Sequence, residues 1–370
     1  MSGIQAVIIA NPKPFRLILR DESDTWECTT EQVNRSTYNY VKLHRATRFI
    51  DVNLKQPFTL GLGYDGSLIL PLIKDYADPD KALDEFNRVI AACFIGGLYI
   101  EAVSPSDLSF GHIANCGYYR HEHPLGDNAE LHRAIGEQGA GSFFTIKLYS
   151  PPQILADDFE SAYKVGNEVL ALVPTLSPTL LTTAFTYYLT RQLRESLTHA
   201  WISIEQTVEH LWQEEIVENA KGGSVPKRRK FLESQQWNLA HRVELLFSLG
   251  VVDEDLYRHL NTARFERNEF QHTGKTPSRN AVNSALTAIS RLLALIANLK
   301  GREYDDQLIT RYLGDEKRPG SPAVTVTNAK NLTKDSDAHW RRLIPLPGFN
   351  EWEGEFETYD DIQLVKIGPE

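Results

Sequence analysis

The stretch from Pro151 to Gly301 constrains the fold most, because its apolar residues recur at helical spacing almost throughout. Cap residues mark where helices begin, as at Ser177, which is followed by Pro178 at the first helical position. The expected helices are 157–172, 177–212 with a break near 195–198, 239–249, 253–274 and 278–299. Helices of these lengths joined by short loops predict an antiparallel bundle.

The N-terminal part has a different sequence pattern, in which short runs of β-forming residues are separated by Asn, Pro, Asp and Gly. These runs favour an antiparallel sheet or a small sandwich. A helix is expected over 78–99, with Asp78 or Asp80 as its N-cap. The expected strands are 6–10, 15–20, 36–54, 58–64, 67–73, part of 100–113, and 142–150.

These patterns predict an α+β chain in three parts. A β-rich domain over 1–150 precedes an all-α antiparallel bundle over 151–300, and a polar linker with a short C-terminal extension fills 301–370. The extension ends in a segment with two tryptophans and several β-forming residues. Such residues seldom stay exposed, so this segment is expected to fold back as short strands.

Charge and composition limit the classes of function. The net charge is −10, yet residues 177–300 hold 15 Lys and Arg against 13 Asp and Glu, the only net-positive part. This permits an anionic ligand there. The longest apolar run stops at Glu101, short of the roughly 20 residues that a membrane-spanning helix needs. With no signal-peptide pattern and three scattered cysteines, a cytoplasmic location without membrane attachment is expected.

A stretch rich in Gly, Asn and His, 112–141, raises the question of a metal site through His121, His123, Asp127 and His132. Their spacing matches no zinc pattern, so a solvated loop and no metal are expected. Cys116, in the same stretch, is expected to be a small buried side chain rather than a nucleophile.

The chemistry-bearing residues gather at the end of the helix that closes at Gly274. Arg267 offers a planar fork of donors for phosphate oxygens, Asn268 a neutral donor and acceptor, and His272 a group that transfers protons near neutral pH. Asn268 and His272 share a helix face, whereas Arg267 and His272 lie about 140° apart. One helix therefore does not direct both at one atom, but two helices meeting across a symmetric interface can.

The motif from Arg267 to His272, RNEFQH, resembles the Arg-Asn form of the Arg, four to six residues, His motif of the HEPN superfamily. The flanking helices, with the earlier WISIEQTVEHLW, resemble the Apea-like HEPN domains of prokaryotic anti-phage and toxin systems over about 177–300. The resemblance implies a metal-independent endoribonuclease that needs no cofactor and cleaves RNA at the interface of a homodimer. It also implies that Glu205, or Glu209 one turn on, orients the arginine or histidine, and that the N-terminal part binds a protein trigger or inhibitor.

Two further features are assigned to RNA binding. The basic run Lys227, Arg228, Arg229 and Lys230 is the densest positive patch, in a loop or frayed helix start, and would hold the RNA backbone together with Arg264.

Simpler interpretations stand beside these assignments. The basic run is also compatible with a solvated loop, and Glu205 with a surface charge. His272 and Gly274 suit an ordinary helix end, and Arg264 and Arg267 a solvated face. On that interpretation the bundle is a non-catalytic module that binds RNA or a nucleotide, or that dimerises.

Overall fold

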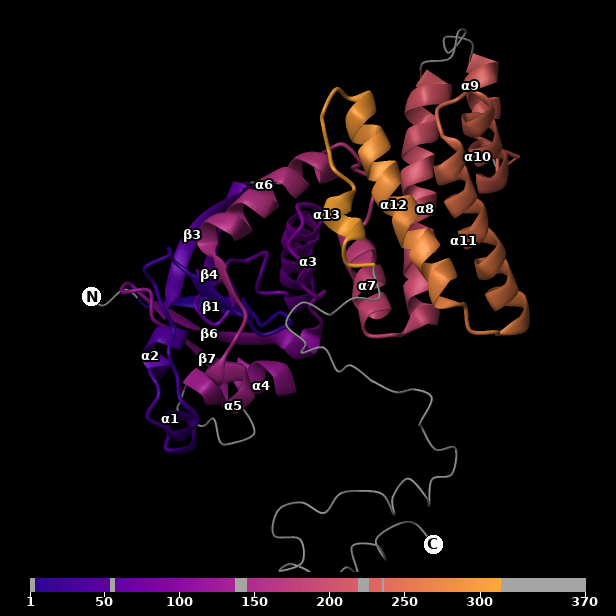
Figure 1. The fold of residues 1–370 in the computed structure, drawn as a ribbon. Coiled ribbons are helices and arrows are strands. Elements are labelled where there is room, and N and C mark those ends of the chain that lie inside the picture. Colours follow the sequence, from indigo (N-terminus) through magenta and orange to yellow (C-terminus); the bar gives the residue numbers. More distant parts are fainter. Residues whose placement is uncertain (1–3, 54–56, 137–144, 219–225, 235, 314–370) are drawn as a thin grey trace, which may run out of the picture. The chain divides into compact units, whose positions relative to one another are not determined.

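The computed structural model describes residues 4–53, 57–136, 145–218, 226–234 and 236–313. Its architecture is α+β, with an antiparallel sheet in the N-terminal part and helices after it, as predicted (Figure 1).

The six-stranded sheet has the order β3-β4-β5-β1-β6-β7. Every neighbouring pair in it is antiparallel, and β1 lies at its centre with β5 and β6 on either side. A separate pair, β2 and β8, runs parallel. The strands are β1 (Ile4–Ala10), β2 (Leu17–Leu19), β3 (Ala46–Asn53), β4 (Pro57–Gly63), β5 (Leu68–Pro71), β6 (Leu108–Ala114), β7 (Tyr119–Pro124) and β8 (Gln153–Leu155).

Helix α3 (Pro79–Ile95) joins the sheet to the helical part. It begins as predicted, because the Asp78 side chain accepts a hydrogen bond from the Asp80 N–H and proline occupies the first turn. One set of its side chains, including Phe86, lies in the core over the sheet. Another set, including Phe94, lies in the core of the helical part.

Several predictions for the N-terminal part are wrong. Within 36–54, α2 (Tyr40–Leu43) replaces the first half of the predicted strand, because the Asn39 side chain caps it at the Lys42 N–H. α1 (Thr30–Asn34) precedes it. Of the strand predicted over 142–150, residues 142–144 lie outside the described residues, and the rest is α5 (Thr145–Tyr149), a helix.

The stretch expected to be a solvated loop forms strands and a helix over most of its described residues. It holds the end of β6, β7 and α4 (Asp127–Gly136). β7 alternates inward and outward residues, so that Tyr119 and His121 are buried. His132 on α4 is buried too, whereas Cys116, predicted to be buried, is exposed in the turn between β6 and β7.

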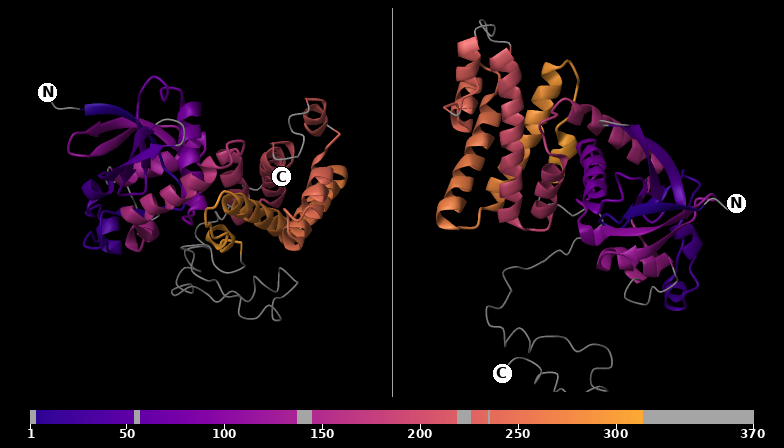
Figure 2. Two further views of the ribbon diagram at one scale, coloured as in Figure 1. Left: turned by 90° about the horizontal axis from the view of Figure 1, so that it is seen from above. Right: turned by 180° about the vertical axis from the view of Figure 1, so that it is seen from behind.

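The helical part follows the predicted pattern closely. The break between α7 and α8 falls just before the predicted 195–198, and Arg191 there has a positive φ of 64°. α8, α11 and α12 lie side by side (Figures 1 and 2). The helices are α6 (Ala156–Ala171), α7 (Pro178–Leu189), α8 (Leu193–Trp212), α9 (Pro226–Leu232), α10 (Leu239–Ser248), α11 (Glu254–Thr273), α12 (Arg279–Leu299) and α13 (Gln307–Thr310).

Residues 301–313, expected to belong to the linker, close the helical core. Tyr304, Ile309 and Leu313 are buried in it. The Tyr304 hydroxyl donates to the Ile95 carbonyl at the end of α3, at 2.9 Å. The segment predicted to fold back as strands lies outside the described residues.

α12 is the one described helix long and apolar enough to cross a membrane. Over half of its most apolar window, 56%, is buried inside the protein. Its buried residues pack in the helical core, as those of a core helix in a folded domain do.

Candidate functional site

The site predicted from sequence lies on α11, whose packing fixes which residues face inward. The Asp253 side chain caps its start at the Leu256 N–H, and Gly274 ends it in the left-handed conformation at φ 71°. Leu256, Leu260 and Ala263 form its buried stripe. Arg267, one turn after Ala263, continues this stripe toward α8.

Arg267 rests on an aromatic ring of α8. Its guanidinium lies 5.7 Å from the centre of the buried Trp201 ring, and its Nη1 donates to the Asn268 Oδ1 at 3.2 Å. Its Nε is buried without a hydrogen-bond partner, and no carboxylate of the described residues pairs with it. Arg267 is therefore a positioned cation with which no described carboxylate forms an ion pair.

The two candidate acids of α8 differ in their contacts. The Glu205 carboxylate accepts a hydrogen bond from Trp201 Nε1 at 2.6 Å. Glu205 therefore acts on Arg267 only indirectly, through Trp201. The Glu205 carboxylate accepts a hydrogen bond at the edge of the indole ring, and the Arg267 guanidinium lies over the face of the same ring. Glu209 pairs instead with Arg242 of α10.

Asn268 and His272 lie exposed on the last two turns of α11. Within the described residues the His272 ring makes no hydrogen bond or ion pair. α11 stays helical to Thr273, so the angular separation of Arg267 and His272 expected for a regular helix remains. A single chain therefore places Asn268 beside Arg267 and one turn before His272 on the same face, but it does not bring Arg267 to His272.

The basic run is helical rather than a loop, since Lys227, Arg228, Arg229 and Lys230 all belong to α9 and all are exposed. Arg229 pairs with Glu233 at 2.9 Å. Arg264 stands apart from this run, on α11. It lies 5.3 Å from the centre of the Phe265 ring and lines a small pocket together with Trp201.

The basic run and His272 lie at opposite ends of α8. Trp212, the last residue of α8, donates to the Leu232 carbonyl of α9 at 3.1 Å. Arg194, near the first, donates to Thr276 just beyond α11 at 2.9 Å. α8 has 20 residues, so about 30 Å separate the two ends, and one short RNA segment does not touch both within one chain.

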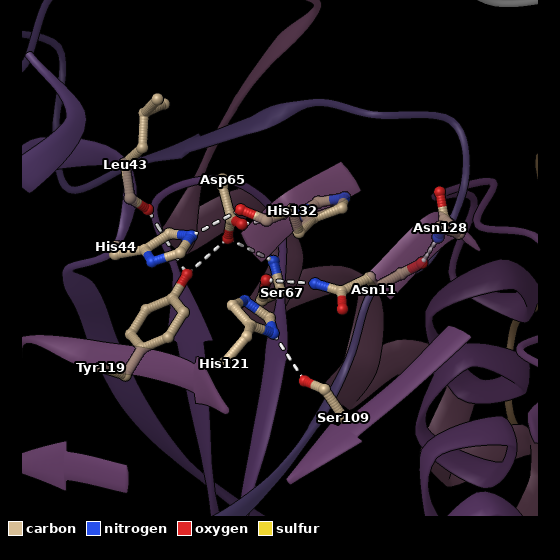
Figure 3. A network of polar contacts seen from close by, with 10 residues as sticks. All are labelled: Asn11, Leu43, His44, Asp65, Ser67, Ser109, Tyr119, His121, Asn128 and His132. Atoms are coloured by element: carbon tan, nitrogen blue, oxygen red, sulfur yellow. Dashed lines mark hydrogen bonds and ion pairs between the residues drawn. The ribbon is translucent and has the colours of Figure 1, made fainter. Parts of the chain in front are cut away.

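A second polar cluster, which the sequence did not predict, lies inside the N-terminal part (Figure 3). Its centre is Asp65, in the turn between β4 and β5. The carboxylate accepts hydrogen bonds from the Tyr119 hydroxyl, from the Ser67 N–H at 3.0 Å and from His132 Nδ1 at 2.6 Å. His44 and His121 complete the cluster, and the side chains of all these residues are buried.

Burial and neighbouring charge set the protonation of this cluster. Burial alone would raise the pKa of Asp65, but the charge and hydrogen bond of His132, with a smaller effect of His44, outweigh it, and the pKa lies well below its usual range. Burial, followed by the charge of His44, holds the pKa of His121 well below its usual value. Asp65 is therefore ionised and His121 neutral near neutral pH.

No protein-family model matches this chain, and no curated protein and no solved structure matches it.

Proposed function

We propose that the chain is an endoribonuclease of defence or toxin type that cleaves RNA without a catalytic metal ion at the α11 cluster. Arg267 is the observation that carries this proposal. Its guanidinium is positioned on Trp201, and no described carboxylate neutralises it. A fixed guanidinium beside solvent-exposed polar groups is suited to a phosphate, because its donors match the phosphoryl oxygens and its charge persists at all relevant pH values.

The reaction requires three tasks of these side chains. The RNA 2′-oxygen forms a bond to the adjacent phosphorus while the bond from phosphorus to the 5′-oxygen breaks, which leaves a 2′,3′-cyclic phosphate. Arg267 stabilises the charge that develops on the phosphoryl oxygens. His272 transfers a proton, either from the 2′-hydroxyl or to the 5′-oxygen. Asn268, hydrogen-bonded to Arg267, positions the guanidinium or the phosphate.

A homodimer completes the site in this proposal. Arg267 faces α8 and His272 faces solvent, so the histidine of one chain would act beside the arginine of the other. Phe265 on the same helix exposes 66% of its surface, which supports a contact between two copies of α11.

The other predicted residues take supporting roles. Glu205 orients Arg267 through Trp201, and the Glu209–Arg242 pair leaves Glu205 as the better candidate for that role. The exposed α9 run and Arg264 would hold the backbone of a longer RNA away from the cleavage point. The N-terminal part would bind the trigger or inhibitor.

Total RNA incubated with the purified chain tests the proposal. Chelator is added at the start of the reaction, and circular dichroism verifies that the protein stays folded. Wild type should cleave RNA, His272→Ala should lose at least about a hundredfold in rate, and Gln271→Ala, its exposed neighbour, should retain the wild-type rate. Equal cleavage by His272→Ala would refute the assignment. Intact RNA with every variant would favour the non-catalytic binding module instead.

A further inference from the structure

We propose that His44, Asp65 and His121 bind one divalent transition-metal ion, zinc by ligand type, inside the N-terminal part. The three residues come from the end of α2, the β4–β5 turn and β7, and Figure 3 shows their side chains gathered around one point. One ligand atom from each lies within 4.8 Å of the others, and all three side chains are buried. Two imidazoles and one carboxylate form a donor set that zinc binds in proteins.

The hydrogen bond of His44 fixes which of its nitrogens is free of a proton. Its Nε2 lies 2.9 Å from the His132 carbonyl oxygen. A carbonyl only accepts, so Nε2 carries the proton in this arrangement, and Nδ1 is the nitrogen that would bind the metal. Donation of the distant N–H to a backbone carbonyl is the usual arrangement of a metal-binding histidine, since it fixes the tautomer and the ring orientation.

His121 supplies the observation that a purely structural hydrogen-bond network leaves unexplained. Its Nδ1 lies 2.5 Å from the Ser109 hydroxyl, while its Nε2 is buried and has no hydrogen-bond partner among the described residues. A buried nitrogen without a hydrogen-bond partner destabilises the folded state, because it has lost its bond to water and gained none in return. When Nδ1–H donates to Ser109, the Nε2 lone pair is available to a metal. Binding of the metal would then remove the destabilisation that the unpartnered nitrogen causes.

Asp65 is held as a metal-binding carboxylate is held. The Tyr119 hydroxyl, the Ser67 N–H and His132 all donate to it, which fixes its orientation.

The surroundings favour a structural ion over a catalytic one. A Cβ atom at Gly136 would overlap the His44 ring, so α4 packs directly against the cluster. Tyr119 stacks on the same ring, with centroids 5.1 Å apart. The ion would join three segments that are distant in sequence, and it plays no part in the RNA chemistry proposed for α11.

Metal content tests the proposal without any RNA assay. The full chain is purified without chelator or a metal-affinity tag from zinc-supplemented medium, and its metal is measured by mass spectrometry. About one equivalent of zinc per folded chain is expected. A folded wild type that carries no metal, and that gains neither thermal stability from added Zn²⁺ nor visible d–d absorption from added Co²⁺, overturns the proposal.

Two histidines of β7 provide a matched pair of variants. His121→Ala should bind metal at least about tenfold more weakly, whereas His123→Ala, at an exposed position of the same strand, should bind as wild type does. Equal metal content in both variants would place the metal elsewhere and overturn the assignment. If His121→Ala does not fold, Ser109→Ala replaces it, with an altered Co²⁺ spectrum expected and an unaltered one contradicting the role of His121.

Discussion

The guanidinium of Arg267 lies 5.7 Å from the centre of the Trp201 ring, which places a cation of α11 on an aromatic face of α8. A lysine at this position keeps the charge but loses the planar fork of donors. We expect Arg267→Lys to lower the rate of RNA cleavage about a hundredfold, with little change in thermal stability. Arg258→Lys, at an exposed position of the same helix, serves as the control and should leave the rate unchanged.

A site shared between two chains predicts complementation. Arg267→Ala and His272→Ala are each expected to be inactive alone. When they are unfolded together and refolded as a mixture, half of the dimers should contain one of each chain and one intact site. Activity should then return to about a quarter of the wild-type value. A mixture as inactive as its components would show that both residues act within one chain or not at all.

Substitutions at Glu205 and Glu209 distinguish an effect on the orientation of Arg267 from an effect on the stability of the bundle. Glu205→Gln weakens the acceptor for the Trp201 indole, so cleavage should fall about tenfold while the bundle remains folded. Glu209→Gln weakens the ion pair with Arg242, which should affect stability slightly and cleavage not at all. Cleavage rates and melting temperatures of both variants decide this, and unchanged cleavage in both would remove the orienting role.

The α9 run is predicted to bind RNA through charge alone. Changing Lys227, Arg228 and Lys230 to Glu should weaken RNA binding and flatten its dependence on salt, because fewer counterions are released. Arg229 is left unchanged because it pairs with Glu233. Lys81→Glu, at an exposed position of α3, is a control for charge change elsewhere. An unaltered slope of log K against log salt in the triple variant would contradict contact between α9 and RNA.

Close backbone packing of α6 against α3 gives a prediction about stability. A Cβ at Gly166 would overlap the Ala92 carbonyl oxygen, and backbone atoms cannot move aside as side-chain ends can. Gly166→Ala should therefore lower the free energy of unfolding by about 3 kcal/mol. Val165→Ala, at a more exposed position of α6, should cost far less. Urea denaturation of both variants measures the difference.

The elements predicted correctly are those whose signals are local. Asp253 and Ser278 cap helices at the predicted places, and Gly274 ends α11. The sequence pattern does not indicate α2, because most residues in 36–54 are β-forming. In the structure, the hydrogen bond of the Asn39 cap outweighs the strand propensity of the few residues that follow it.

The two polar clusters show the same limit. Arg267, Asn268 and His272 stand together in sequence, so their grouping was visible, although the contact of Arg267 with Trp201 depends on how two helices pack. The second polar cluster brings together His44, Asp65 and His121 from three segments that are distant in sequence. Only the alternation of Tyr119 and His121 in β7 indicated inward-facing residues, and it was obscured by the surrounding Gly, Asn and His.

Helix α3 belongs to both hydrophobic interiors, through Phe86 on the sheet side and Phe94 among the helices. The Tyr304 hydroxyl, from the end of the helical part, donates a hydrogen bond to the Ile95 carbonyl at the end of α3. A helical fragment that starts at residue 151 would lack α3 and leave a strip of its own core in water. The sheet and the helical bundle therefore share α3 as part of both hydrophobic cores, so a displacement of the sheet would move the bundle with it.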